Sequence, residues 1–181
     1  MKTDRLTTQD LLFKGITKLL QRQAIDKITV KDIINQAGVS RATFYRYYYD
    51  KYDLLNSYYE MILEDTLYRF KSDMTWEEAV YSIYKEIKRN LKFYQNAISS
   101  SDQNSLKNYI FEMSREFHLN VLEENGIDIN DWKTVKAIES YIYGNLEIMH
   151  LWIKDGMKES IEDMMEVFDM GIPSEFIRYF K

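Results

Sequence analysis

A short pattern, a Ser or Thr followed three residues later by Asp or Glu, marks where several helices begin in this sequence. Examples are Thr29–Asp32, Thr75–Glu78 and Ser160–Asp163. In this capping box the hydroxyl accepts a hydrogen bond from the helix backbone, and the carboxylate reaches back to the cap. The apolar residues that follow recur at the 3.6-residue period of a helix, and no stretch alternates as a strand does. The sequence therefore predicts an all-α fold of about eight or nine helices.

The stretch from Thr29 to Tyr52 reads as two short helices joined by a tight turn. Gly38 can end the first helix, because glycine tolerates the left-handed conformation needed just past a helix C-terminus. Ser40 can cap the second helix. At 100° per residue Phe44 and Tyr48 share one apolar face, and the rest of the surface is polar. This arrangement is a helix-turn-helix. Its two helices and the helix that precedes them are predicted to form a three-helix head.

The polar surface of the second helix has the chemistry of a DNA-reading element. Arg guanidinium groups can bind guanine edges or phosphates, and Ser and Tyr hydroxyls can bind phosphates. Ala42 and the Thr43 methyl group can meet a thymine methyl group. We expect DNA contacts from Ser40, Arg41, Ala42, Thr43, Tyr45, Arg46 and Tyr47. The preceding helix has a row of basic side chains at four-residue spacing, Lys14, Lys18 and Arg22. These side chains could contact DNA phosphates or could simply form a solvated face.

At these residues the chain resembles the TetR/AcrR family of bacterial transcription regulators. The likeness is carried by Thr29-Val30, Ala37-Gly38-Val39-Ser40, Thr43-Phe44-Tyr45, and Asp50-Lys51 followed by Asp53-Leu54-Leu55. A weaker likeness spans 143–168, and many relatives have His-Phe where this chain has Tyr47-Tyr48. The resemblance adds Thr29 and Lys51 to the expected DNA contacts. Lys51 would hold a phosphate at the start of a long helix.

Charge is distributed unevenly along the chain. The net charge is −5, but residues 1–51 contain ten Lys or Arg against five Asp, so the rest of the chain carries −10. A basic head and an acidic body suit a protein that docks one end on double-stranded DNA. We therefore expect a helix-turn-helix DNA-binding domain over residues 1–52 and a helical ligand-binding and dimerisation domain over residues 53–181.

The last two long helices are candidates for a dimer interface. One helix-turn-helix reads only a few base pairs, so a homodimer would read both halves of a near-palindromic operator. The family resemblance implies that these helices pair with their symmetry mates in a four-helix bundle. The expected interface residues are Ile148, Leu151, Trp152, Met164, Met165 and Phe168. The alternative is that these side chains form the core of a single chain.

Aromatic and methionine side chains on the other body helices could line a site for a small-molecule effector. The candidate lining residues are Tyr59, Ile62, Tyr84, Tyr94, Tyr109, Met113, Phe117 and Tyr141. Aromatic residues at helical spacing also build ordinary cores. The family resemblance implies an inducer pocket somewhere in the body, and the effector itself is unknown.

The sequence contains few of the residues that an enzyme or a metal-binding protein would need. The chain has no cysteine and no glycine-rich phosphate loop. Glu147-x-x-His150 has the spacing of a di-metal ligand pair, but the second such pair is missing. We expect no metal, no cofactor and no enzyme activity. No apolar run is long enough to span a membrane, so we expect a cytoplasmic protein.

Together these features predict a sequence-specific, ligand-responsive, homodimeric transcription regulator, and a repressor rather than an activator. The alternative is a DNA-anchored module whose acidic, aromatic body docks another protein, so that a protein rather than a small molecule controls it.

Overall fold

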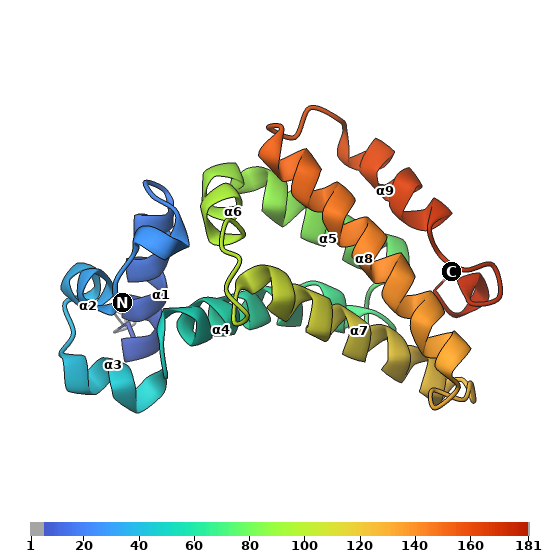
Figure 1. Cartoon of the computed structure of the whole chain (residues 1–181), viewed down its shortest axis with the longest axis horizontal. Helices are drawn as coiled ribbons and strands as arrows, with labels where there is room; N and C mark the ends of the chain where they lie inside the picture. The colour runs from blue at the N-terminus through green and yellow to red at the C-terminus, as the bar shows by residue number, and fades with distance from the viewer. Residues whose placement is uncertain (1–5, 181) are drawn as a thin grey trace. The chain divides into compact units, whose positions relative to one another are not determined.

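The structure is a computed structural model that describes residues 6–180. Over this range it contains nine α-helices and no strand, which confirms the predicted all-α class (Figure 1). Contacts divide the chain into two compact units. The first unit contains the residues up to 62 together with 92–107, and the second contains 63–91 together with the residues from 108 onward.

The first unit is built around the three helices of the head. It contains α1 (Thr8–Leu20), α2 (Val30–Ala37), α3 (Arg41–Tyr47), most of α4 (Lys51–Glu64) and nearly all of α6 (Leu91–Ala97), with a 3-10 turn η1 (Ile25–Lys27) between α1 and α2. Its core contains fully buried side chains from several of these elements, namely Leu12, Ile16, Leu20, Ile25, Ile33, Phe44, Leu54 and Leu55. This core orients α3.

Helices α1 and α2 approach each other closely at Gly15. A Cβ atom on Gly15 would lie 3.1 Å from the Cβ of Ala37 and 3.4 Å from the carbonyl oxygen of Ile33. A contact of 3.1 Å is tighter than normal packing allows, so a side chain here would push α1 away from α2. The absence of a side chain at Gly15 therefore lets α1 support the helix-turn-helix from behind.

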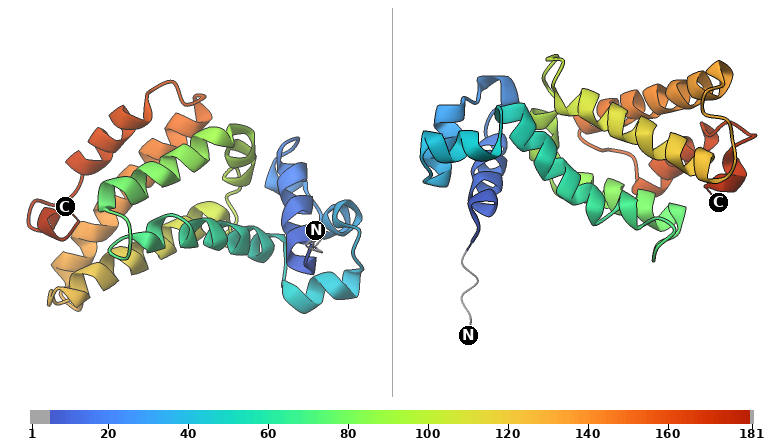
Figure 2. Two further views of the ribbon diagram at one scale, coloured as in Figure 1. Left: turned by 180° about the vertical axis from the view of Figure 1, so that it is seen from behind. Right: turned by 90° about the horizontal axis from the view of Figure 1, so that it is seen from below.

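The second unit consists of α5 (Trp76–Arg89), most of α7 (Leu106–Glu124), α8 (Trp132–Lys154), α9 (Ile161–Met170), and the 3-10 turns η2 (Leu67–Arg69) and η3 (Ile177–Tyr179). Figure 2 shows α9 alongside α5 and α8. Aromatic contacts join these helices. The ring centroids of Tyr84 in α5 and Trp152 in α8 lie 5.6 Å apart, and those of Tyr141 in α8 and Phe168 in α9 lie 5.3 Å apart.

Two helices are shorter than the apolar periodicity of the sequence indicates. The helical period continues from Asp50 to about residue 71, but α4 ends at Glu64, and the backbone of Thr66 leaves the helical region at φ −129° and ψ −91°. The period also continues over 75–98, but the helix is split at Asn90, which ends α5 before α6 begins at Leu91. Apolar residues keep their period across both breaks, so periodicity alone did not reveal them.

The compact units also differ from the domains expected from sequence. The first unit extends beyond residue 52 to residue 62, and it includes residues 92–107 from the middle of the chain. The division at residue 52 describes a proposed division of function and stays a prediction.

Candidate nucleic-acid interface and ligand pocket

The turn between α2 and α3 has the local geometry that the sequence predicts. Gly38 ends α2 with φ 69° and ψ 32°, in the left-handed region. The Ser40 side chain caps α3 and accepts a hydrogen bond from the backbone N–H of Thr43 at 3.0 Å. At the start of α2, Thr29 and Asp32 form a complete capping box. Both helices are therefore fixed at their N-termini by local contacts.

One side of α3 packs into the core. Phe44 and Tyr48 are buried, as the helical period predicts, and their ring centroids lie 6.1 Å apart. Phe13 of α1 lies 6.2 Å from the ring of Tyr48. These contacts fix the rotation of α3 about its own axis, so the opposite surface is held toward solvent.

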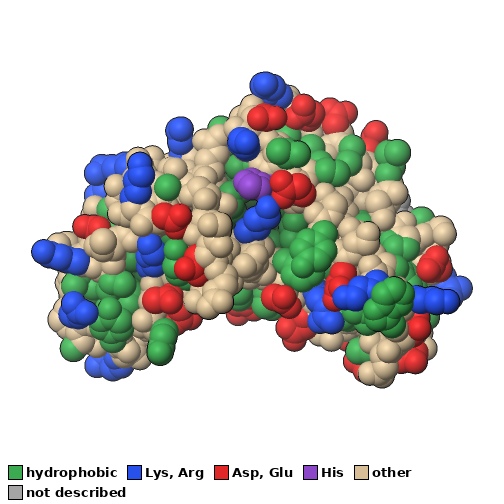
Figure 3. All heavy atoms as spheres, in the orientation of Figure 1, with side chains coloured by type: hydrophobic (Ala, Val, Ile, Leu, Met, Phe, Trp, Pro, Cys, Tyr) green, Lys and Arg blue, Asp and Glu red, His purple; other side chains and the backbone are tan. Residues whose placement is uncertain are grey.

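Most of the residues predicted to contact DNA lie on the outward surface of α3. Its exposed side chains are Arg41, Ala42, Tyr45, Arg46 and Tyr47, with Thr43 half-buried beside them. The Arg41 guanidinium lies 5.3 Å from the Tyr45 ring centroid, and the Arg46 guanidinium lies 5.2 Å from that of Tyr47. A guanidinium held over a ring keeps donors at its edge for base or phosphate acceptors. Figure 3 shows basic side chains over this helix-turn-helix.

Thr29 is committed to its cap. Its Oγ1 donates to the Asp32 carboxylate at 2.6 Å and accepts from the Asp32 backbone N–H at 3.1 Å. A hydroxyl has only one hydrogen to donate. The DNA contact predicted for Thr29 would therefore require this hydroxyl to change partner.

Lys51 occupies a different environment from the one predicted. Its Nζ donates to the backbone carbonyl oxygens of Ile25 at 2.8 Å, Ile28 at 3.0 Å and Asp26 at 3.3 Å. An ammonium group has three donors, and these carbonyl groups take all of them. Lys51 thus ties the start of α4 to the η1 turn. A phosphate contact would need one of these bonds to break, so the geometry does not support the predicted role.

Tyr49 is not among the predicted contacts, and it is more exposed than Tyr45 and Tyr47, the two tyrosines that are. Its side chain is 87% exposed, and its backbone N–H donates to the Asp53 carboxylate at 2.8 Å. The sequence did contain a signal, because at 100° per residue Tyr49 falls on the polar side of the helix that Phe44 and Tyr48 define. Tyr49 therefore belongs with the candidate phosphate contacts.

The residues predicted to line one ligand pocket are divided between the two units. Tyr59, Ile62 and Tyr94 belong to the first unit, and the other five, Tyr84, Tyr109, Met113, Phe117 and Tyr141, belong to the second. Met113 and Phe117 line a surface pocket of about 510 Å³ that also includes Tyr68 and Phe70. Tyr84 and Tyr141 are buried in the core of the second unit. That these residues line one ligand pocket stays a prediction.

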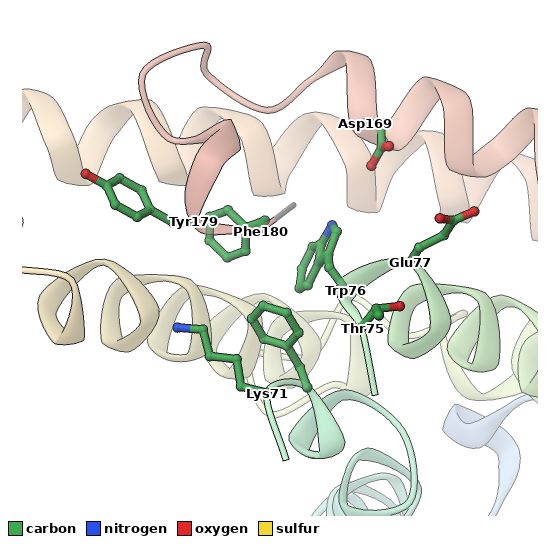
Figure 4. Close-up of a pocket in the computed structure, with 8 residues that line it drawn as sticks. Lys71, Thr75, Trp76, Glu77, Asp169, Tyr179 and Phe180 are labelled. Carbon is green, nitrogen blue, oxygen red and sulfur yellow. The ribbon is translucent and has the colours of Figure 1, made fainter. Parts of the chain in front are cut away.

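A pocket of about 550 Å³ opens at another place in the second unit (Figure 4). Its lining residues come from the segment after η2, the start of α5, the end of α9 and the C-terminal segment, and they are Phe70, Lys71, Thr75, Trp76, Glu77, Asp169, Tyr179 and Phe180. Trp76 and Phe180 are buried, and their ring centroids lie 4.9 Å apart. Phe180 was not among the expected lining residues, because no local pattern reveals a contact so distant in sequence.

Burial changes the protonation behaviour of two residues in the second unit. Desolvation lowers the pKa of His118 from 6.5 to about 4, although a backbone hydrogen bond to Ser114 opposes that shift. Desolvation likewise raises the pKa of Tyr141 far above its usual value of 10. Both side chains are therefore uncharged at neutral pH.

The predicted dimer residues separate into exposed and buried groups. Ile148 and Leu151 of α8 are 40% and 47% exposed. Trp152 and Met164 are only 3% and 5% exposed, so they have little surface left for a second chain. Met165 is half-buried, and so is Phe168, whose ring packs against Trp76, Tyr84 and Tyr141. Trp152, Met164 and Phe168 are thus core residues of the chain, and the predicted interface narrows to the exposed side chains.

The fold and the surface of α3 together define a helix-turn-helix DNA-binding protein with a helical body. Residues 12–58 match a family profile described as bacterial regulatory proteins of the tetR family, and residues 74–172 match the profile TetR_C_8, described as a transcriptional regulator C-terminal region. The second match alone covers more than half of the chain. The chain therefore belongs to the TetR family of transcriptional regulators, and it is a DNA-binding regulator rather than an enzyme.

One similar protein is the HTH-type dhaKLM operon transcriptional activator DhaS of Lactococcus lactis subsp. lactis (strain IL1403). It is 25% identical over 154 residues, which cover 77% of this chain and 82% of the relative. A solved structure named dihydroxyacetone kinase operon activator DhaS superposes with a TM-score of 0.60 and 21% identity, covering 93% of this chain and 97% of that one. The structure of a TetR transcriptional regulator from Rhodococcus sp. RHA1 superposes with a TM-score of 0.58 and 16% identity. The match covers 92% of this chain and 96% of that one. These two structural matches support the fold.

None of the described helices combines the length and the apolar character that crossing a bilayer requires.

Proposed function

We propose that the protein is a sequence-specific, ligand-responsive, homodimeric transcription regulator that reads a near-palindromic operator with α3. The observation that carries this proposal is the construction of α3. Buried Phe44 fixes the helix from behind, and two Arg–Tyr stacks line its outward surface. Arg donors on an exposed helix are suited to guanine edges in the major groove and to the flanking phosphates.

Exposed apolar side chains on α8 and α9 support the homodimer. They are Tyr143, Ile148, Leu151, Val167 and Met170. Figure 3 shows hydrophobic side chains among acidic ones over these two helices. Exposed apolar side chains are costly to leave in water, and a two-fold axis would bury the same side chains on both chains. Two copies of α3 would then read two half-sites.

Helix α4 supports the proposed response to a ligand, because it contributes residues to both compact units. An effector that binds one arrangement of the dimer more tightly than another shifts the population toward that arrangement. We propose that the favoured arrangement changes the spacing of the two α3 helices, so that they no longer fit successive major grooves.

The sign of regulation depends on where the operator lies. A dimer bound over a promoter blocks polymerase, whereas one bound upstream can assist it. Repression is our proposal for a promoter-overlapping site. The relative named as an activator shows that activation also occurs among similar proteins. A reporter fusion with the operator moved between these two positions would decide the sign for this protein.

The first test is a gel shift with DNA fragments from upstream of the protein's own gene, in excess competitor DNA and at two salt concentrations. Phosphate contacts alone would give salt-sensitive binding to any fragment. We expect a discrete shift that survives competitor, with a protected site of near-palindromic halves. If this test and a selection from random DNA both yield no specific site, the DNA-reading proposal fails. A co-purifying protein would then favour the alternative of a partner-binding module.

Variants of α3 test which residues read the operator. Arg41→Ala and Tyr45→Ala should each weaken specific binding by about 5- to 150-fold, the effect of losing a base or stacking contact worth about 1–3 kcal/mol. Arg89→Ala is the matched control, because Arg89 is an exposed arginine in α5. If Arg41→Ala and Tyr45→Ala bind the operator as tightly as Arg89→Ala does, α3 is not the reading helix.

A further inference from the structure

Six aromatic side chains, counting the His118 imidazole, pack together in the second unit. This aromatic cluster consists of Trp76, Phe117, His118, Tyr141, Phe168 and Phe180. The His118 ring lies 5.5 Å from the Trp76 ring, 5.5 Å from the Tyr141 ring and 5.1 Å from the Phe180 ring. Four helices and the C-terminal segment therefore meet at one aromatic core.

Three polar atoms of this cluster find no hydrogen-bond partner among the described residues. They are Trp76 Nε1, His118 Nε2 and Tyr141 Oη, and all three side chains are more than nine-tenths buried. Protein interiors pair almost all such atoms, because an unpaired buried donor or acceptor loses its bond to water and gains nothing. Three of them within one ring cluster indicate a place that is built to receive a polar group.

The chemistry of each atom can be deduced. His118 Nδ1 lies 2.6 Å from the carbonyl oxygen of Ser114, and a carbonyl can only accept. Nδ1 therefore carries the proton, and Nε2 presents a lone pair, because the imidazole is neutral at this burial. Trp76 Nε1 can only donate, whereas the Tyr141 hydroxyl can do both. The cluster thus offers one donor, one acceptor and one group of either kind.

The pocket of about 550 Å³ leads from solvent to this cluster. Trp76 and Phe180 belong both to its lining and to the cluster. Figure 4 shows the indole nitrogen of Trp76 directed toward the side of the pocket where Asp169 and Phe180 lie. The Phe180 ring lines the pocket and lies 4.9 Å from the Trp76 ring and 5.1 Å from the His118 ring, so it borders both the pocket and the cluster.

We propose that this site binds a small uncharged molecule with an apolar body and a hydroxyl group. The hydroxyl oxygen accepts from Trp76 Nε1 and its hydrogen is donated to His118 Nε2. The ring centroids of Trp76 and His118 lie 5.5 Å apart, and a hydroxyl group can make hydrogen bonds of about 3 Å to two partners at once. The apolar body packs among the aromatic rings. A charged ligand is disfavoured, because the same burial that keeps His118 neutral would strip a charge of its water.

The test uses the full chain with its tryptophans labelled with ¹⁵N. The sequence has three tryptophans, and each has a different environment. Trp76 Nε1 lacks a partner, Trp152 Nε1 donates to the Glu159 carbonyl at 3.3 Å, and Trp132 is exposed. Phenol, benzyl alcohol and cyclohexanol serve as hydroxyl probes, and toluene is the control. We expect saturable movement of the Trp76 indole signal with a hydroxyl probe, while the signals of Trp132 and Trp152 stay in place.

One variant tests the named acceptor. His118→Phe removes the acceptor nitrogen and should weaken binding of the hydroxyl probe by about tenfold, while the response to toluene stays unchanged. Tyr143→Phe on the exposed side of α8 should bind as the wild type does. The proposal is overturned if none of the three hydroxyl probes moves the Trp76 signal, or if toluene binds as tightly as phenol.

This inference rests on the proposed ligand-responsive function, and a gel shift with phenol separates the two. Binding of phenol at Trp76 without any change in DNA affinity supports the site and counts against ligand control. A change in DNA affinity without movement of the Trp76 signal supports ligand control and overturns this site.

Discussion

At the scale of single residues, Lys51 shows how a charged side chain can serve the fold. Its ammonium group is enclosed by three backbone carbonyl groups of the segment from Ile25 to Ile28. The carbonyl oxygen of Ile25 also accepts from the backbone N–H of Ile28 at 3.0 Å, and the lysine adds a charged donor to it and to the carbonyl oxygens of Asp26 and Ile28. Charged donors make stronger bonds than neutral ones. Lys51 therefore positions the approach to α2 and, through it, the reading helix.

Lys51→Met should lower the free energy of unfolding by about 1–3 kcal/mol, because it removes the charged donor that the carbonyl oxygens of Ile25, Asp26 and Ile28 share. Urea unfolding measures this loss. Lys92→Met, an exposed lysine in the same compact unit, is the control and should change little. If Lys51 instead bound a DNA phosphate, Lys51→Met would leave the free energy of unfolding unchanged. The salt dependence of DNA binding would then fall by about one phosphate contact.

His118 makes stability depend on pH. Its pKa is lowered to about 4 in the folded chain, against 6.5 for an ordinary histidine, so the folded state resists protonation. Below pH 6.5 the unfolded chain takes up this proton and the folded chain does not. The contribution to stability is therefore complete above pH 6.5 and is lost as the pH falls toward 4.

Between pH 7.5 and 5.0 this effect should lower the free energy of unfolding by about 2 kcal/mol, at 1.36 kcal/mol per pH unit below 6.5. Urea unfolding at the two pH values measures it, and His118→Gln should remove that part of the loss. His150→Gln replaces the only other histidine, which is half-buried, and should leave the loss as in the wild type. Equal pH dependence in both variants would show that His118 is not the responsible group.

At the scale of elements, local signals explain what the sequence could predict. The turn at Gly38, the caps at Thr29 and Ser40, and the inward position of Phe44 all depend on residues within one or two turns of each other. Helix periodicity and cap chemistry act over that range. The exposed surface of α3 could therefore be predicted almost completely from the sequence.

Contacts between distant residues were beyond such reasoning. Lys51 is held by carbonyl groups of the η1 turn, and Trp76 meets Phe180 from the end of the chain. Apolar spacing shows that a face is buried but not which element covers it. For this reason the sequence indicated which aromatic residues are buried but not which of them meet, and it did not place Trp152 in the core of the chain.

At the scale of the whole molecule, the exposed apolar surface of α8 and α9 makes the association state testable. Leu151→Glu places a charge on this surface and should shift the protein from dimer to monomer, because burying an unpaired charge is costly. Sedimentation at several protein concentrations measures the change. Met61→Glu alters a methionine of α4 that is 40% exposed and should leave the dimer intact. A wild-type monomer at all concentrations, or a dimeric Leu151→Glu variant, would refute this interface.

The first compact unit is discontinuous in sequence, and this limits how the protein can be recombined. The Asn96 amide donates to the carbonyl oxygen of Leu20 at 2.7 Å, and the hydroxyls of Tyr52 and Ser100 lie 3.3 Å apart. A chimera that transplants only residues 1–52 onto another regulator would lose both contacts with the 92–107 segment. The portable module is therefore the head with its later segment, so a functional exchange needs crossover points on both sides of that segment as well as in α4.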